Sequence, residues 1–417
     1  MAYYMMYDTI VVGGGPAGSV ASMELAKRGY NVVLLERFKF PRFKVCAGGI
    51  GYRLWRRFKN IVEDGVPIKG ALLAGPSGFS VTIDAGEILA YDVSRDVFDS
   101  RLVELAISSG VELKEETYVT NVKILSDRAK VFTKKGTFEG RSVIGADGVN
   151  SLVAKSLGLR PANWFEDIGF CVVSLVPRRS PEDELIHEFY LGVMGEGYGW
   201  TFPHVDHLNI GLGTLRKNFK NPKRDFVDFI TKYPLVSKKV KRVPEKIMGF
   251  YIPANGMLRK LYTTRALLVG DAGGFVNTMT GEGLNMAIKT AEVATDVISN
   301  ALDEDDLSEV KLSEYQRRVE RDPEIGEELR IGRLLRGILF KNVGLLEDLL
   351  KLSSGDRELL NLFLDIIYVR KPYPKIVKHV FSKIPIKVAL KFFMKSPKEI
   401  ITMRMNGGDP YMPPPKR

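Results

Sequence analysis

A glycine-rich turn near the N-terminus limits the fold of this chain more than any other feature. The apolar segment 8–12 runs directly into Gly13-Gly14-Gly15-Pro16-Ala17-Gly18, and residues 19–28 follow with a helical pattern. Gly13 allows a tight turn, Gly15 lets the backbone approach a pyrophosphate, and Gly18 permits close packing of helix on strand. The helix N-terminus offers amide donors to phosphate oxygens. This order of strand, turn and helix predicts a dinucleotide site at Gly13, Gly15, Ala17 and Gly18.

An acidic residue follows where such a site needs one. A second apolar segment, 31–35, ends in Glu36, about 20 residues beyond the turn. A carboxylate at this place accepts hydrogen bonds from the ribose hydroxyls of an adenosine and disfavours a 2′-phosphate. A glycine pattern alone can mark an ordinary turn, but the flanking strands and the acid together favour a binding site.

The rest of the chain does not continue as a simple dehydrogenase. Between Val111 and Gly140 apolar residues alternate around a turn at 134–136, which predicts antiparallel strands. A later apolar strand, 266–269, leads into two more glycine-rich turns, Gly270-Asp271-Ala272-Gly273-Gly274 and Thr280-Gly281-Glu282-Gly283, and then into a helix from Leu284. A long ligand that touches several loops explains this arrangement.

Together these motifs resemble the flavoprotein hydroxylase superfamily. The resemblance implies the cofactor FAD and an α/β fold, with an FAD-binding Rossmann-like domain of three layers, an inserted β-rich substrate domain and a C-terminal helical region. It places the FAD-binding domain at 1–75, 96–160 and 255–300, the β-rich domain at 76–95 and 161–254, and the helical region at 301–417. It also assigns to the cofactor site Arg37, Arg95, Val119, Asp271, Gly281, Gly283 and Leu284.

Two further segments narrow the resemblance. They are Pro41-Arg42-Phe43-Lys44-Val45-Cys46-Ala47-Gly48-Gly49 and Tyr198-Gly199-Trp200-Thr201-Phe202-Pro203. With the 270–283 block they are similar to the geranylgeranyl reductase family, which includes archaeal enzymes of the digeranylgeranylglycerophospholipid reductase type that saturate isoprenoid chains of membrane lipids. One departure is Thr278, where the family commonly has proline.

The resemblance implies a reduction of isoprenoid C=C bonds by hydride from reduced flavin together with a proton. It places Cys46, Ala47, Gly48 and Gly49 beside the flavin, makes Cys46 and Tyr198 candidate proton donors, and puts Tyr198, Trp200 and Phe202 at a lipid-binding cavity. The residues alone leave open that Cys46, Trp200 and Phe202 are packing residues. Cys171 lies in the apolar segment 169–176 and is expected to be a core residue.

Other functions share this scaffold. An FAD-dependent monooxygenase or halogenase is one alternative, a reductase of an isoprenoid-quinone tail or of a chlorophyll-pathway substrate is a near variant, and a non-enzymatic flavin-binding protein is a third. The expected partners are an isoprenoid lipid or diphosphate substrate and an external electron donor. The donor is NAD(P)H or ferredoxin, and the sequence does not show which.

The composition argues against several kinds of site and several classes of protein. No pair among the four histidines has a metal-ligand context comparable to a helical His-Glu-x-x-His motif, which argues against a metal site. Two well-separated cysteines argue against a disulfide framework and favour a reducing compartment. No apolar run is long enough for a spanning helix or a signal segment. The single glutamine, Gln316, beside many charged residues is typical of a thermophile.

The net charge of +11 indicates an anionic partner. Because no nucleic-acid motif occurs, we expect a phosphorylated ligand or an acidic membrane surface and not a nucleic acid. The segment 375–395 alternates Lys with apolar residues, and it either lies on an acidic bilayer or packs on the protein itself. The expected location is cytoplasmic, with a peripheral contact at the inner face of the cell membrane.

Overall fold

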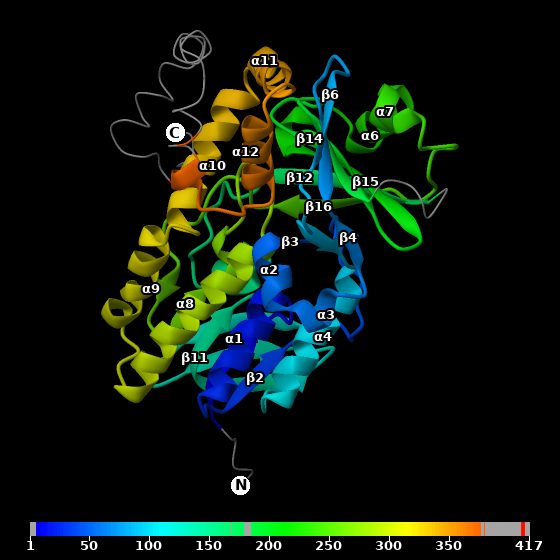
Figure 1. The fold of residues 1–417 in the computed structure, drawn as a ribbon. Helices are drawn as coiled ribbons and strands as arrows, with labels where there is room; N and C mark the ends of the chain where they lie inside the picture. Colours follow the sequence, from blue (N-terminus) through cyan, green and yellow to red (C-terminus); the bar gives the residue numbers. More distant parts are fainter. Residues whose placement is uncertain (1–5, 167, 179–184, 377–378, 380–409, 413–417) are drawn as a thin grey trace.

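A computed structural model describes residues 6–166, 168–178, 185–376, 379 and 410–412. It contains two large sheets, which lie in the lower and upper parts of Figure 1, and a small three-stranded sheet between them. The segment 375–395, considered above for membrane contact, lies outside the described residues except for Lys375, Ile376 and His379. None of the described helices is long and apolar enough to cross a membrane.

The lower sheet has eight strands, and its centre is parallel. Strand β1 (Tyr7–Val12) pairs in parallel with β2 (Val32–Leu35) on one side and with β11 (Gly136–Gly145) on the other. Beyond these lie β8 (Glu112–Lys114), β18 (Ala266–Leu268) and β17 (Tyr262–Thr263). Strands β1 and β2 are almost wholly buried, as expected for parallel strands that are covered on both faces.

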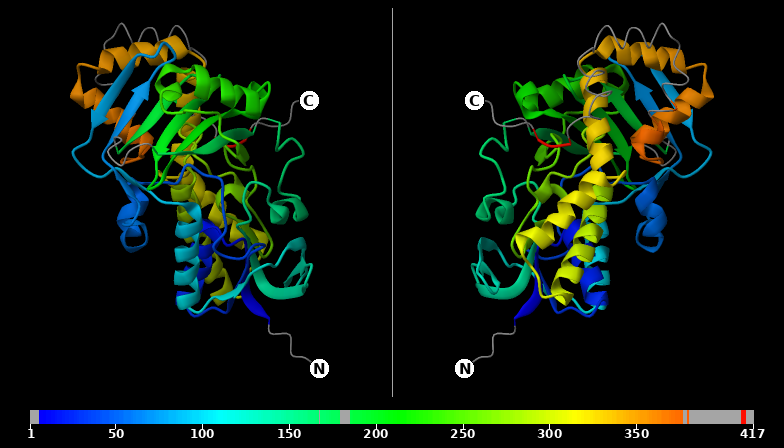
Figure 2. Two further views of the ribbon diagram at one scale, coloured as in Figure 1. Left: turned by 90° about the vertical axis from the view of Figure 1, so that its right-hand side faces the viewer. Right: turned by 90° about the vertical axis from the view of Figure 1, so that its left-hand side faces the viewer.

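Three layers form around this sheet. Helices α1 (Pro16–Lys27), α4 (Arg95–Ser108) and α8 (Leu284–Asp303) pack together on one face. Strands β9 (Val119–Ile124) and β10 (Ala129–Thr133) extend from β11 as an antiparallel meander, with α5 (Leu152–Ser156) against β9. Figure 2 shows α4 and the meander on opposite sides of the lower sheet. The expected three-layer Rossmann-like architecture is confirmed.

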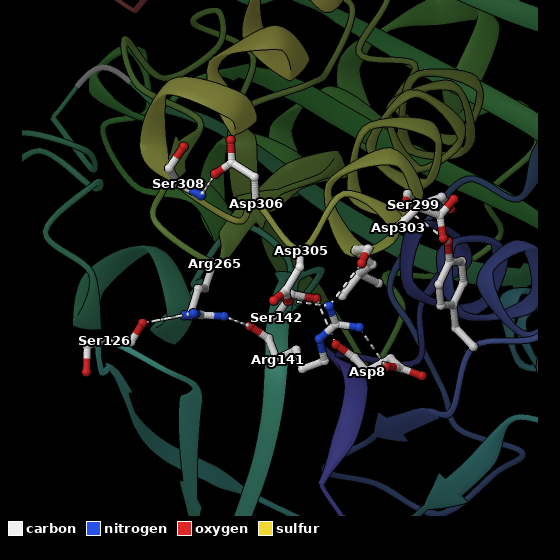
Figure 3. A network of polar contacts seen from close by, with 12 residues as sticks. Asp8, Ser126, Arg141, Ser142, Arg265, Ser299, Asp303, Asp305, Asp306 and Ser308 are labelled. Carbon is white, nitrogen blue, oxygen red and sulfur yellow. Dashed lines mark hydrogen bonds and ion pairs between the residues drawn. The ribbon is translucent and has the colours of Figure 1, made fainter.

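A polar network fixes one end of α8 to the sheet (Figure 3). Arg141 of β11 bonds Asp8 at 3.3 Å, the carbonyl of Leu302 at 2.9 Å and Asp305 at 2.8 Å. Arg265 donates to the carbonyl of Arg141 at 3.1 Å. Because α8 has 20 residues and is about 30 Å long, fixing this end also fixes its N-terminus, which lies at the 280–284 turn.

The upper sheet has seven strands in the order β16-β12-β15-β14-β13-β5-β6. Their bounds are β5 (Gly70–Ala74), β6 (Ser80–Asp84), β12 (Gly169–Pro177), β13 (Ile186–Leu191), β14 (Tyr198–Pro203), β15 (His207–Leu215) and β16 (Met248–Ile252). All neighbours are antiparallel except β13 and β5. Strand β5 therefore belongs to this sheet, although it precedes the boundary expected at residue 76.

Helices cover both faces of the upper sheet. One face packs on α6 (Pro222–Lys232) and α7 (Pro234–Ser237) through Phe226, Phe229 and Val236. The other face packs on α10 (Gly326–Leu339), α11 (Val343–Ser353) and α12 (Arg357–Ile367), which follow α9 (Glu309–Arg321). The C-terminal helices predicted from periodicity are thus present, and they close one side of the upper sheet.

The small sheet joins the two parts. Its order is β3 (Gly49–Gly51), β7 (Ala90–Asp92) and β4 (Val66–Ile68). Helices α2 (Tyr52–Arg57) and α3 (Lys59–Val62) follow β3 directly. Because β3 continues from the Cys46 loop, this sheet fixes that loop between the two large sheets.

Gly18 tests how closely α1 approaches the turn. A Cβ at Gly18 would lie 1.8 Å from the carbonyl oxygen of Gly13, so Gly18→Ala forces the helix away from the strand. We expect a loss of about 1–3 kcal/mol in the free energy of unfolding, measured by urea titration. Gly344→Ala in α11, where a Cβ meets nothing within 4 Å, is the control and should leave stability unchanged or slightly higher. Equal unfolding midpoints for Gly18→Ala and the unaltered protein would contradict this packing.

Candidate active site

One cavity of about 660 Å³ lies between the two large sheets. The glycine turn, the 42–49 loop, the 271–285 turns, strands of the upper sheet and the C-terminal helices all contribute to its wall. It contains every residue that the sequence nominated for cofactor or substrate except Gly18, which packs against Gly13 instead. Its size is ordinary for a cofactor or ligand site.

The glycine turn leaves open space at the N-terminus of α1. Gly13 has φ +102°, and a Cβ there would lie 2.5 Å from the carbonyl oxygen of Ala146. At Gly15, by contrast, a Cβ would meet only a guanidinium nitrogen of Arg42, at 3.8 Å. Glu36 stands beside this space, and its carboxylate accepts from the amides of Gly14 at 2.8 Å and Phe38 at 3.0 Å. The turn thus presents amides and a fixed carboxylate to a dinucleotide.

A buried charge cluster holds the 42–49 loop beside the turn. Asp99, which is fully buried, accepts from Arg95 at 2.7 and 3.0 Å and pairs with Arg42 at 3.0 Å. Arg42 also donates to the carbonyl of Gly14 at 3.2 Å. Burial acts to lower the pKa of Arg95, but Asp99 and Cys46 outweigh it and raise that pKa. Arg95 is therefore a permanent cation at the cavity wall.

Lys44 adds a second cation at the wall. Its ammonium lies 3.1 Å from the centroid of the Phe250 ring. Burial, followed by the nearby charge of Arg95, lowers the pKa of Lys44 to about 8. Burial raises the pKa of Asp271, which also lines the cavity, and Lys44 and Arg95 act against that rise. The cavity therefore holds interacting charges of both signs.

The turn before α8 faces the same space. Asn277 accepts from the amides of Met279 and Thr280, both at 3.0 Å, and Gly281 has φ +72°. Helix α8 then starts at Leu284, after Gly283. A helix N-terminus favours negative charge on whatever lies in front of it.

Two side chains at this turn fit a polar ligand. Within the described part of the chain, Glu282 Oε2 and Asn285 Nδ2 are buried and have no hydrogen-bond partner, and both residues line the cavity. Unpaired buried polar atoms of this kind are unfavourable unless a ligand satisfies them. Together with the open space at Gly15, they fit a long ligand with polar groups at both ends, such as FAD. Gly13, Gly15, Glu36, Gly283 and Leu284 would hold it.

The Cys46 loop is fixed by strands of the upper sheet. Asn209 donates to the carbonyl of Cys46 at 2.8 Å and accepts from the indole of Trp200 at 3.0 Å. The imidazole of His204 lies 2.8 Å from the carbonyl of Ala47. Gly48 has φ +90°, and a Cβ there would lie 2.6 Å from the His204 ring. These contacts hold the Cys46 loop against the upper sheet, in the wall of the cavity.

Tyr198 connects the two sides of the cavity. Its hydroxyl donates to the carbonyl of Thr280, so β14 is tied to the turn before α8. Burial raises the pKa of Tyr198, and Cys171 and Cys46 add to the rise. Cys171, expected in the core, lies on β12 as predicted but also lines the cavity, and burial raises its pKa to about 12.

The other two aromatic residues expected at the substrate end, Trp200 and Phe202, are both buried and both line the cavity. The Trp200 ring covers Gly211, where a Cβ would lie 2.0 Å from it. Phe202 stacks on His187 with a centroid distance of 3.6 Å. His187 bonds the buried Asp92 at 2.8 Å. Core packing and cavity lining are therefore compatible for Trp200 and Phe202.

The C-terminal helices complete the apolar end of the cavity. Their contribution is Phe340, Ile366, Ile367, Tyr368 and Val369. No sequence pattern indicated this contribution, since apolar periodicity shows that a helix is buried but not what it covers. Also missed were Arg42, Lys44, Asp92, Asp99, His187 and Asn209. Only the spacing of Arg95 and Asp99, four residues apart on a helix, could have indicated a pair.

A buried carboxyl lies behind the turn before α8. Glu328 of α10 is fully buried, accepts from Asn277 at 3.0 Å and pairs with Arg53 at 3.3 Å. Burial raises the pKa of Glu328 to about 8, while Arg53 acts against the rise. Thr278, in place of the usual proline, lies here with its hydroxyl unpaired within the described residues.

Glu328 predicts a pH dependence of stability. Its pKa is about 8 in the folded protein, whereas an unfolded Glu titrates near 4.3. Between these values the folded state binds more protons, so stability should fall as pH rises from about 5 to about 8. The Glu328→Gln variant has no carboxyl to titrate at this position, so its fall in Tm between pH 5 and pH 8 should be smaller by several degrees. Thermal unfolding at each pH measures this. Glu327→Gln, its neighbour in α10, is the control, and matching profiles for both variants would contradict the assignment.

Known proteins are similar to this chain in sequence and in fold. The family described as FAD binding domain matches residues 6–321. The digeranylgeranylglycerophospholipid reductase of Methanococcus vannielii is 30% identical, over 75% of this chain and 82% of its own length. These matches confirm FAD as the cofactor of the cavity.

Two solved structures resemble the whole chain. A geranylgeranyl bacteriochlorophyll reductase-like protein of Thermoplasma acidophilum superimposes with a TM-score of 0.71 at 23% identity, covering 96% of this chain and 98% of its own. The halogenase PltM, solved with phloroglucinol and FAD, superimposes with a TM-score of 0.68 at 16% identity, covering 97% of this chain and 99% of its own. At these identities the likeness shows the fold alone.

Proposed function

The chain belongs to the family of FAD-dependent oxidoreductases that includes the digeranylgeranylglycerophospholipid reductases, and we propose that it reduces C=C bonds in the geranylgeranyl chains of a polar, archaeal-type membrane-lipid precursor. The observation that carries the proposal is that one cavity is lined both by the glycine turn and by apolar side chains of the upper sheet and the C-terminal helices, with Cys46 also in its wall.

The chemistry needs both ends of this cavity. An isolated trisubstituted alkene is not polarised toward hydride, so a proton must reach one carbon as a hydride reaches the other. Reduced FAD supplies the hydride when it is bound. The protein must therefore hold the alkene in a dry space, supply the proton and stabilise the charge that the proton leaves behind.

Cys46 is the proposed proton donor. Loss of its proton leaves a thiolate, and the cations Arg95 and Lys44 line the same cavity, where they would stabilise that negative charge. Tyr198 is less suited because burial raises its pKa and its hydroxyl already donates to Thr280. We assign Tyr198 instead to holding the turn before α8 against the upper sheet.

The apolar wall supports the same proposal. Rings of Phe189, Trp200 and Phe202, with Phe340 and Ile366 from the C-terminal helices, enclose the end beyond Cys46. Such a wall excludes water and can take a long hydrocarbon chain. Aromatic faces also stabilise positive charge, which develops on the more substituted carbon as the proton arrives.

Product mass tests the reaction type. The FAD-loaded protein is incubated without oxygen, with dithionite in place of the external donor and with a geranylgeranyl phosphoglycerol lipid. We expect a mass gain of two hydrogens for each double bond reduced. An unchanged lipid without oxygen, and a hydroxylated or halogenated product only when oxygen and halide are supplied, would overturn the proposal in favour of a monooxygenase or halogenase.

Cys46 variants test the proton donor. Cys46→Ala should lower the rate of alkene reduction roughly 10²–10⁴-fold, since general-acid catalysis contributes about that much, while FAD content and Tm stay unchanged. Cys171→Ala, at another cysteine of the same cavity wall, is the matched control and should keep most of the activity. Full activity in Cys46→Ala would make Cys46 a packing residue.

The substrate also has to be collected from a membrane surface. A peripheral contact at the inner face of the cell membrane is part of the proposal, and the positive net charge of +11 supports it. The electron donor is external, NAD(P)H or ferredoxin.

A further inference from the structure

We propose that a basic groove beside the cavity binds the phosphate of the substrate's headgroup, an inference that rests on the proposed function. The groove has a volume of about 410 Å³ and lies between α2 and α8. Its basic lining residues are Arg53, Arg56, Arg57, Lys289 and Arg370, and its acidic ones are Glu292 and Glu324.

The groove adjoins the cavity. Arg53, Leu54 and Asn285 line both spaces. Two chain segments also pass from one to the other: Gly51 lies in the cavity wall and Arg57 in the groove, while residues 366–369 lie in the cavity wall and Arg370 in the groove. These shared and neighbouring residues bring the groove close to the polar head of a lipid whose chain occupies the cavity.

Several of the basic residues are already held by acids. Arg57 pairs with Glu292, and Lys289 pairs with Glu324 at 3.1 Å. Arg370 bonds Asp365 at 2.6 Å and Glu87 at 3.1 Å. These pairs hold the cations in place around the groove, and the lining still carries more positive than negative charge.

Two guanidinium groups have donors to spare. Arg56 donates to the hydroxyl of Tyr52 and lies over the Tyr52 and Trp55 rings, and it makes no ion pair within the described residues. Arg53 pairs with Glu328 and Glu324, yet its Nη2 is buried and has no hydrogen-bond partner in the described part of the chain. A phosphate, which has several strong acceptor oxygens, suits such planar donors.

A phosphate also fits better than an uncharged headgroup. A hydroxyl would leave Arg56, which makes no ion pair within the described residues, without a counter-charge, whereas a phosphate supplies one and lies beside the Arg53 donor. The same chemistry is present in the phosphates of a pyridine nucleotide. We commit to the lipid phosphate because the groove shares Arg53, Leu54 and Asn285 with the cavity, and because Arg370 of the groove directly follows residues 366–369 of the cavity wall.

A pair of matched ligands tests the proposal without turnover. Geranylgeranyl phosphate and geranylgeraniol differ only in the phosphate, and their Kd values for the oxidised, FAD-loaded protein are measured by calorimetry. Geranylgeranyl phosphate should bind more tightly. Arg56→Gln and Arg57→Gln should each weaken its binding roughly tenfold, as loss of one charge-assisted hydrogen bond does, and should leave geranylgeraniol unchanged.

Lys59→Gln in α3 is the charge-matched control. This substitution also removes one positive charge, two residues after Arg57, but the Lys59 side chain does not line the groove. The Kd values of this variant should match those of the unaltered protein. A uniform weakening in all three variants would reduce the effect to net charge and would overturn a defined phosphate site.

The remaining outcomes separate this inference from the proposed function. Charge-dependent binding of geranylgeranyl phosphate without any alkene reduction would leave the groove assignment standing and refute the function. Reduction of both ligands with equal Kd values, unaffected by Arg56→Gln, would leave the function standing and refute the groove. If Arg56→Gln weakens NADPH and leaves geranylgeranyl phosphate unchanged, the site belongs to a nucleotide and the lipid assignment is overturned.

Discussion

The buried carboxylate of Asp99 holds the active site together. It pairs with Arg95 of its own helix and with Arg42 of the 42–49 loop, and Arg42 also bonds the carbonyl of Gly14 in the glycine turn. Buried ion pairs add little net stability, but removing one partner leaves an uncompensated charge in the interior. The cluster therefore acts mainly to position the Cys46 loop against the dinucleotide turn, and it places a permanent cation beside Cys46.

Contacts across the two sheets complete the site. Asn209 connects the Cys46 loop to Trp200, and Tyr198 connects the upper sheet to the turn before α8. The C-terminal helices then close the apolar end against the same sheet face. Cofactor, proton donor and hydrocarbon would thus meet in one enclosed volume, although the residues come from segments far apart in the chain.

How much could be predicted from the sequence depended on whether a feature is local. The glycine turn, Glu36 and the turn before α8 are determined by backbone conformation within a few residues, and the structure has them as expected. His187 and Asp92, or Asn209 and Cys46, are far apart in sequence and meet only through strand pairing, for which no spacing gives a signal. Cys171 shows that even a local pattern leaves the surroundings of a side chain unpredicted. Strand alternation puts Cys171 and Val173 on one face of β12, but it cannot tell whether that face meets a core or a cavity.

The central claim is that this cavity brings an isoprenoid double bond to reduced FAD, and single-turnover flavin reoxidation tests it most directly. The FAD-loaded protein is reduced with one equivalent of dithionite without oxygen and mixed with a geranylgeranyl lipid or with its fully saturated phytanyl counterpart. We predict that the unsaturated lipid restores the absorbance of oxidised flavin, with one alkene reduced for each flavin, and that the saturated lipid leaves it reduced. Flavin that stays reduced with both lipids and reoxidises only when oxygen is admitted would contradict the account.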